Sequence, residues 1–177
     1  MMRQIRKQRL TFRRRAVWLG LAAALFAADP ASAQAVPAGF SGETVVNPLT
    51  GAAIDGMDAV SYFTEREPLP GSPNFELVWK GVPWFFASAA NRAAFASAPE
   101  VYAPQFGGHG LTGLSRGFLA DGNPHIYAVF SNRLYLFYST VNRQAFELAR
   151  LSVIEDAETS WRIIGPGAGV AMAEALP

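Results

Sequence analysis

The segment from Phe75 to His109 constrains the fold most strongly, because residues typical of strand, turn, helix and loop follow one another in it without a gap. Aromatic and β-branched residues flank Lys80-Gly81, which predicts a tight hairpin at about 75–87. Ser88 is then placed to cap a helix. The loop 105–110 comes next, and its glycines permit backbone angles that other residues resist.

Residues from about 125 to 138 alternate in the way typical of β-strands, on both sides of a short polar turn, and predict a second hairpin. The residues after it, 141–150, are compatible with a helix, and Ser152 and Glu155 have the spacing of a capping box for a further helix. Between the hairpins, 111–123 contains three glycines and is expected to be irregular. We therefore predict a compact, single-domain α+β fold of two antiparallel hairpins, short helices and a C-terminal helical segment, with no internal repeat beyond the hairpins.

The motifs of the central region, taken in order, resemble the YHS domain family. They are the run Asp55–Phe63, Gly81 with Trp84–Phe86, Ser88–Arg92 with Phe95, and Pro99–Gly108. The resemblance covers about residues 50–162 and implies a small exported bacterial protein that binds a metal ion or a small ligand. In the family this binding is often ascribed to a cysteine after the double glycine. Here His109 and Gly110 follow the double glycine, and the chain has no cysteine.

The N-terminus has the composition of an export signal. Seven of the 15 basic residues lie within 1–15, and the apolar run 16–28 is short for a membrane span. The small residues up to Ala33 predict cleavage before Gln34, although cleavage after Ala35 and an uncleaved anchor remain alternatives. The adjacent Arg14 and Arg15 suit either a twin-arginine signal or a general secretory signal.

We therefore expect a periplasmic or secreted protein. Its predicted parts are a signal peptide (1–33), an irregular leader (34–51), a YHS-like domain (52–163) and a flexible tail (164–177). Removing the signal leaves eight of the 15 basic and 13 of the 14 acidic residues, a net charge of about −5. Such a charge disfavours contact with nucleic acid or anionic lipid, and we expect no membrane span after cleavage.

The two histidines of the chain, His109 and His125, are candidate metal ligands, because neutral imidazole binds zinc or copper(II). Two histidines cannot complete a closed zinc site, so carboxylates such as Asp58 or Asp121 would have to join them. The alternative is that His109 lies on a polar loop and that each imidazole bonds to backbone or water. If a metal does bind, its affinity should decrease as the pH falls through the histidine pKa of about 6.5.

A small polar pocket around the glycine-rich loop is the other candidate site. Its predicted members are Asp58, Tyr62, Tyr102, His109, Ser115 and Arg116. A structural alternative exists for two of them, since Asp58 can cap a helix and Tyr102 can belong to the core.

We expect no enzymatic activity. The chain has neither a cysteine nor the G-x-S-x-G turn of a serine nucleophile. The residues from Gly108 to Gly113 spell the dinucleotide fingerprint, but the expected strand before it and helix after it are missing. The sequence thus favours a non-catalytic domain that binds a metal ion or small ligand through the loop after Phe106. The alternative is a cell-envelope interaction domain without a bound ligand.

Overall fold

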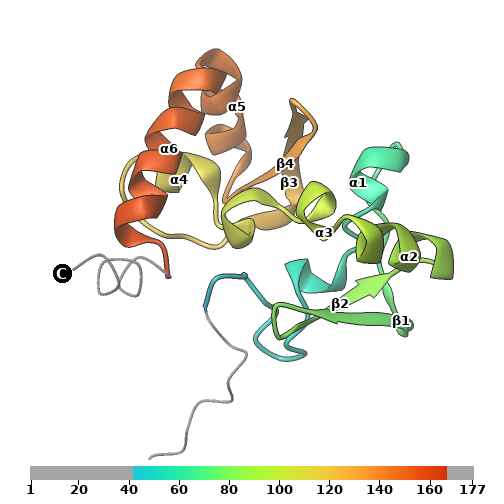
Figure 1. The fold of residues 1–177 in the computed structure, drawn as a ribbon. Helices are drawn as coiled ribbons and strands as arrows, with labels where there is room; N and C mark the ends of the chain where they lie inside the picture. The colour runs from blue at the N-terminus through green and yellow to red at the C-terminus, as the bar shows by residue number, and fades with distance from the viewer. Residues whose placement is uncertain (1–41, 167–177) are drawn as a thin grey trace, which may run out of the picture. The chain divides into compact units, whose positions relative to one another are not determined.

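A computed structural model describes residues 42–166, which belong to one compact unit and have the predicted α+β fold (Figure 1). The elements are η1 (Ile54–Gly56), α1 (Ser61–Thr64), β1 (Ser72–Trp79), β2 (Val82–Phe86), α2 (Ala89–Ser97), α3 (Pro99–Tyr102), η2 (Gln105–Gly108), α4 (Leu111–Leu114), β3 (Asn123–Phe130), β4 (Arg133–Phe137), α5 (Thr140–Leu148) and α6 (Arg150–Ile164). The predicted signal peptide and most of the predicted tail lie outside the described residues.

Both predicted hairpins are confirmed as two-stranded antiparallel sheets, β1–β2 and β3–β4. Each turns through two residues with positive φ: Lys80 and Gly81 in the first hairpin, Ser131 and Asn132 in the second. Two consecutive positive φ angles match the right-handed twist of the flanking strands. Pro83 is tolerated in β2 because this strand has only one neighbour.

The structure contradicts the expectation that the chain has no internal repeat beyond the hairpins. A 3-10 turn, a short helix, a hairpin and two consecutive helices occur in this order twice, first in 54–102 and then in 105–164. The first long helix of each half begins with the same sequence pattern, Ser-x-x-Asn-Arg-x-Ala-Phe, at 88–95 and 139–146, in which the serine is the residue before the helix. In both halves the serine caps the helix by accepting a hydrogen bond from the backbone N–H of the asparagine.

The loops before the hairpins repeat in backbone conformation rather than in side chains. Three consecutive residues have positive φ in each half: Ile54, Asp55 and Gly56, then Phe106, Gly107 and Gly108. Three backbone hydrogen bonds of the first loop each have a counterpart in the second loop. Met57 N donates to Ile54 O (3.1 Å), as His109 N does to Phe106 O (3.1 Å), and Asp58 N donates to Leu69 O (2.9 Å), as Gly110 N does to Ala120 O (2.7 Å). Gly71 N donates to Gly56 O (2.8 Å), as Gly122 N does to Gly108 O (3.0 Å). Sequence patterns do not reveal this similarity, because the side chains of the two loops differ.

Two predictions for the second half were wrong. The segment expected to be irregular contains α4, which packs on α6 and β4. The last helix begins at Arg150 rather than at a capping box, and the Ser152 hydroxyl donates back to Ala149 O inside the helix (3.2 Å). α6 needs no separate cap sequence, because its stripe of Val153, Ile154, Ala157 and Trp161 packs against the second core.

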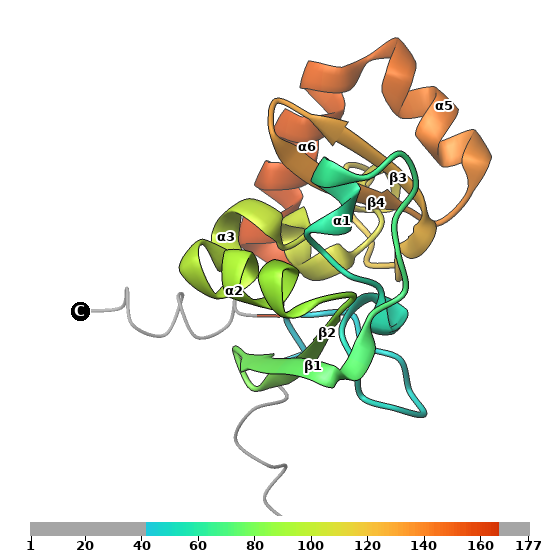
Figure 2. The same ribbon diagram turned by 90° about the vertical axis from the view of Figure 1, so that its right-hand side faces the viewer.

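The core consists of two clusters that meet at the second hairpin. Leu134 and Leu136 on one face of β4 belong to the first cluster, which also contains the buried side chains of 53–103. Tyr135 and Phe137 on the opposite face belong to the second, with α4, α5 and α6. Figures 1 and 2 both show α1 close to the second hairpin, so the two halves are packed together. Within 42–166 no helix combines the length and apolar character needed to cross a membrane.

Candidate functional site

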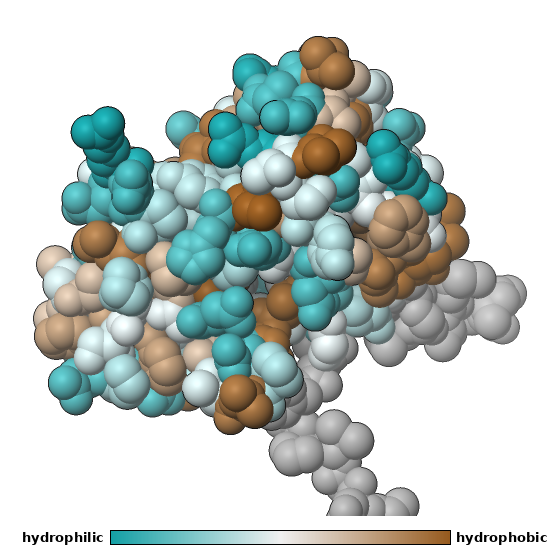
Figure 3. Space-filling model, turned by 180° about the vertical axis from the view of Figure 1, so that it is seen from behind, coloured by the Kyte–Doolittle hydropathy of each residue, from teal (hydrophilic) through white to brown (hydrophobic). Residues whose placement is uncertain are grey.

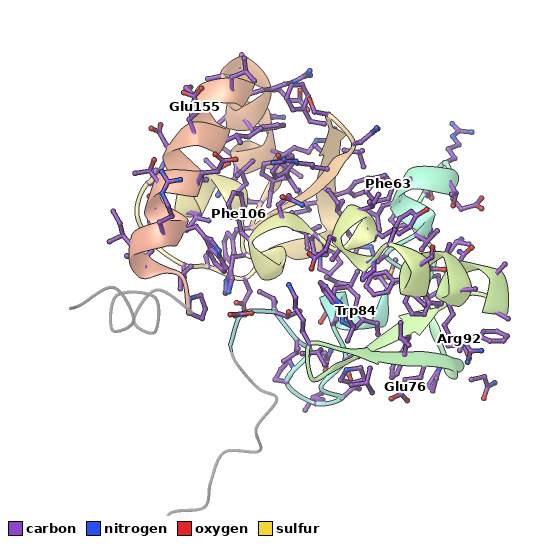
Figure 4. All side chains as sticks on the ribbon, viewed as in Figure 1. Phe63, Glu76, Trp84, Arg92, Phe106 and Glu155 are labelled. Atoms are coloured by element: carbon purple, nitrogen blue, oxygen red, sulfur yellow. The ribbon has the colours of Figure 1, made fainter. Side chains whose placement is uncertain are left out.

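A cleft of about 540 Å³ lies where the tip of the first hairpin, the loop around η2 and the end of α6 come together. Its lining residues are Glu43, Thr44, Trp79, Lys80, Trp84, Glu100, Ala103, Pro104, Gln105, Phe106, Gly107, Trp161, Arg162 and Gly165. Figure 4 labels two of them: Trp84 on β2, and Phe106 on the loop before α4, close to α6.

Aromatic rings form the walls of this cleft. Trp79 and Trp84 are neighbours across the first hairpin, with ring centroids 5.7 Å apart. Phe106 and Trp161 meet from the loop and α6, with centroids 5.8 Å apart. Such rings offer flat apolar surfaces with electron-rich faces, which suit stacking with a planar ligand or contact with a cation.

Charged side chains of both signs also line the cleft. Lys80 Nζ lies 3.3 Å from Glu100 Oε1 and 4.4 Å from the centre of the Trp79 ring. Arg162 extends from the last turn of α6 and donates to Thr159 Oγ1 (3.2 Å). The cleft thus combines apolar walls with polar groups that can fix the orientation of a ligand.

The glycine-rich loop forms one side of the cleft. Phe106 and Gly107 have φ angles of 55° and 62°. A Cβ atom at Gly107 would lie only 1.4 Å from the carbonyl oxygen of Glu43, so only glycine fits there. The N–H of Val45 donates to Gly107 O (2.8 Å), which holds the leader across the loop. The segment predicted as an irregular leader therefore supplies part of the site, through Glu43 and Thr44.

Asp58, the first of the predicted ligand residues, is fully buried and binds the protein itself. Its Oδ1 accepts from the N–H of Val60 (2.9 Å) and of Ser61 (3.4 Å), so it holds the turn that leads into α1; the N-cap of α1 itself is Val60 and not Asp58. Its Oδ2 accepts from Ala87 N (2.8 Å) and Asn91 Nδ2 (2.6 Å). The carboxylate therefore joins α1, the end of β2 and α2.

Three further predicted ligand residues also make internal contacts. Tyr62 donates to Pro124 O (2.8 Å), and burial raises the pKa of its hydroxyl, with smaller contributions from Tyr127 and from nearby carboxylates. The half-buried Tyr102 packs edge-on against Phe63, with centroids 5.6 Å apart. Ser115 Oγ donates to Thr112 O (3.1 Å). None of these three residues lines the cleft.

Arg116 is the one predicted ligand residue that lines a cavity described in the structure. It is exposed, at a smaller hollow of about 320 Å³ that it shares with Phe118, Ala120, Tyr138 and Asn142. Neither of these two cavities is lined by more than one of the six residues proposed to converge.

His109 differs from the expected histidine on a polar loop, since only 9% of its surface is exposed. Its ring lies 5.7 Å from that of Trp161, and neither ring nitrogen has a hydrogen-bond partner. The nearest carboxylate oxygen, Asp121 Oδ1, is 3.9 Å from Nδ1. His125 is exposed on β3.

No group of three or more His, Asp and Glu side chains that could hold a metal ion occurs in the described part of the chain. Binding of zinc or copper(II) to the histidines therefore stays a prediction.

No family model matches the chain, and neither a curated protein nor a solved structure shows significant similarity to it. The resemblance to the YHS family thus depends on the short motifs alone. Sequence reasoning missed the cleft residues Trp79 and Trp161, because each reads as an ordinary core aromatic. A signal that could have found them is the presence of three tryptophans in the predicted domain, at 79, 84 and 161.

Proposed function

We propose that this chain is an exported, non-catalytic domain of the YHS type that binds a small ligand in the cleft beside its glycine-rich loop. One observation carries the proposal: the cleft of about 540 Å³ has walls of Trp79, Phe106 and Trp161, beside the buried Trp84. Ligand sites typically measure about 300–1,000 Å³ and combine apolar walls with a few polar groups. The ligand we expect has a flat apolar ring and at least one polar substituent.

The alternative function, an interaction domain without a ligand, has weaker support. Several large apolar side chains are exposed, among them Leu49, Leu148 and Ile163. On the face seen in Figure 3 the hydrophobic residues are scattered among hydrophilic ones and do not form one continuous patch. Isolated apolar residues are normal on protein surfaces, whereas a continuous patch would indicate an interface.

Flat-ring compounds should bind in the cleft and shift the indole N–H resonances of Trp79 and Trp161 in a saturable manner in two-dimensional nitrogen–proton NMR spectra. Suitable probes are indole for aromatic stacking and benzamidine for a cationic ring. Trp161→Ala should weaken binding of the best probe by about tenfold, because contact between two rings contributes about 0.5–1.5 kcal/mol beyond area burial.

Leu148→Ala is the control, since Leu148 is an exposed apolar residue outside the cleft and should leave the affinity unchanged. Circular dichroism must show that both variants are folded. If no probe gives a saturable change, or if Trp161→Ala binds as well as the unmodified protein, the interaction-domain alternative is favoured.

The export part of the proposal predicts a shortened chain outside the cytoplasm. Intact mass spectrometry of the periplasmic or secreted fraction should give a protein that begins at Gln34 or Val36. The double variant Arg14→Lys, Arg15→Lys keeps the charge of the N-terminus, so it should block export only if the route is the twin-arginine one. A full-length mass, or retention of the unmodified chain in the cytoplasm, would contradict the prediction.

A further inference from the structure

The two halves of the repeat differ at one buried polar position. Asp58 and Gly110 are equivalent, because their N–H groups make the same loop hydrogen bond, to Leu69 O (2.9 Å) and to Ala120 O (2.7 Å). In the first half the Asp58 carboxylate accepts from the Ala87 N–H and the Asn91 side chain. The second half has a glycine there and so provides no carboxylate of its own.

The groups that surround Asp58 in the first half have counterparts in the second half. The repeated Ser-x-x-Asn-Arg-x-Ala-Phe sequence makes Asn142 equivalent to Asn91, and the residue before its serine, Tyr138, equivalent to Ala87. A Cβ atom at Gly110 would lie 3.2 Å from the backbone nitrogen of Tyr138 and 3.5 Å from Ala120 O. The Tyr138 N–H is therefore placed beside position 110 much as the Ala87 N–H is placed beside Asp58.

Tyr138 and Asn142 both line the smaller hollow of about 320 Å³, together with Ala120, Phe118 and Arg116. The Tyr138 N–H has no loop carbonyl or side-chain acceptor within 42–166. The Oδ1 atom of Asn142 accepts from Ser139 Oγ (3.1 Å), so its Nδ2 remains a donor. An acceptor bound in this hollow would use both donors.

The remaining lining residues indicate what the acceptor carries. Arg116 is exposed and has no ion-pair partner in the described part of the chain, so it can neutralise an anion. Phe118 and Tyr138 are 51% and 66% exposed and offer apolar ring surface beside the donors. One cationic group, two N–H donors and two rings suit a monocarboxylate with an apolar body better than a multiply charged phosphate.

We propose that this hollow is a second ligand site, which binds a small aromatic or otherwise apolar monocarboxylate. The carboxylate of the ligand takes the place that Asp58 occupies in the first half. Its oxygens accept from Tyr138 N–H and Asn142 Nδ2, Arg116 supplies the positive charge, and the ligand body covers Phe118 and Tyr138. This site is separate from the aromatic cleft and shares no lining residue with it.

The test is a titration of the purified protein with benzoate, followed by the amide resonance of Tyr138 in two-dimensional nitrogen–proton NMR spectra. We expect a saturable shift of this resonance. Benzyl alcohol, which has the same ring without the charge, should bind about tenfold more weakly, because hydrogen bonds to charged groups contribute about 1.5–3 kcal/mol. Equal binding of the two compounds, or no saturable shift with benzoate, would overturn the proposal.

Two variants locate the site. Gly110→Asp supplies a tethered carboxylate and should abolish benzoate binding; the backbone at Gly110, with φ −66° and ψ 112°, is accessible to aspartate. Arg116→Gln should weaken benzoate binding about fivefold to tenfold, whereas the matched control Arg92→Gln, an exposed arginine in the first half, should not change it.

Benzoate binding that persists in a folded Gly110→Asp variant would overturn the proposal. If circular dichroism shows that this variant is unfolded, the two arginine variants decide instead. Equal benzoate affinities of Arg116→Gln and Arg92→Gln would overturn the proposal. These outcomes are independent of ligand binding in the aromatic cleft. The cleft is tested with other probes and through Trp161, whereas this site is tested with benzoate and through the amide resonance of Tyr138.

Discussion

Replacing Trp84 with alanine should lower the free energy of unfolding by about 3–5 kcal/mol, the usual cost of deleting a large aromatic side chain from a core. The Trp84 ring is 1% exposed and packs against Phe95 and Trp79, with centroid distances of 5.0 and 5.7 Å. For a chain of this size, such a loss should decrease the melting temperature by about 10 °C or more. Thermal unfolding followed by circular dichroism measures the shift.

Trp84→Phe is the matched control for this prediction. The indole N–H of Trp84 is buried and has no hydrogen-bond partner, so removing it costs no hydrogen bond. The phenylalanine ring retains most of the apolar contact, and we expect a loss well below that of the alanine variant. A melting temperature unchanged by Trp84→Ala would mean that the ring contributes no packing energy and that the first core is assigned wrongly.

Replacing Asp58 with alanine should also destabilise the fold by about 3–5 kcal/mol, because each buried donor left without its acceptor costs about 1–3 kcal/mol. Two of the groups that donate to the Asp58 carboxylate, the Ala87 N–H and the Asn91 side chain, lie about 30 residues further along the chain. Both lose their carboxylate acceptor in the variant, and α1 loses its connection to the start of α2. Chemical unfolding of the purified variants gives the free-energy difference directly.

Two further substitutions test whether the loss of stability comes from the missing carboxylate or from the empty space that the alanine leaves. Asp58→Asn keeps the volume but turns one acceptor oxygen into a donor, so it should still be destabilising. Asp55→Asn changes an exposed carboxylate three residues away that accepts from Asn47 Nδ2 (3.2 Å), and should have almost no effect. Equal stability of the Asp58 and Asp55 variants would show that Asp58 is not a structural anchor.

The repeat explains why these two predictions involve the first half. Its long helix is fixed both by the Ser88 cap and by the Asp58 carboxylate. The second half keeps the cap, through Ser139, but has Gly110 in place of the aspartate. Its stability depends more on α6, which packs against α4 and which has no long counterpart in the first half. The second half can therefore leave a polar hollow at the surface.

Local sequence was sufficient to predict both hairpins and the first long helix. Lys80-Gly81 and Ser131-Asn132 determine the turns, and Ser88 determines where α2 begins, because each acts through residues only a few positions away. The burial of Trp84 was also predictable, from its place in an aromatic strand. The export signal, too, is a local feature of composition, and it stays a prediction.

Only the tertiary structure decided which side chains form sites. Asp58 and His109 were expected at a ligand, but long-range packing buries both, Asp58 against Ala87 and His109 against Trp161. The cleft joins Glu43, Trp79 and Trp161, which are far apart in sequence, so no local pattern could predict their contact. The equivalence of Asp58 and Gly110 was likewise hidden, because it is a match of backbone hydrogen bonds and not of side chains. Turns and caps depend on near neighbours, whereas sites depend on the arrangement of distant segments, which only the folded chain determines.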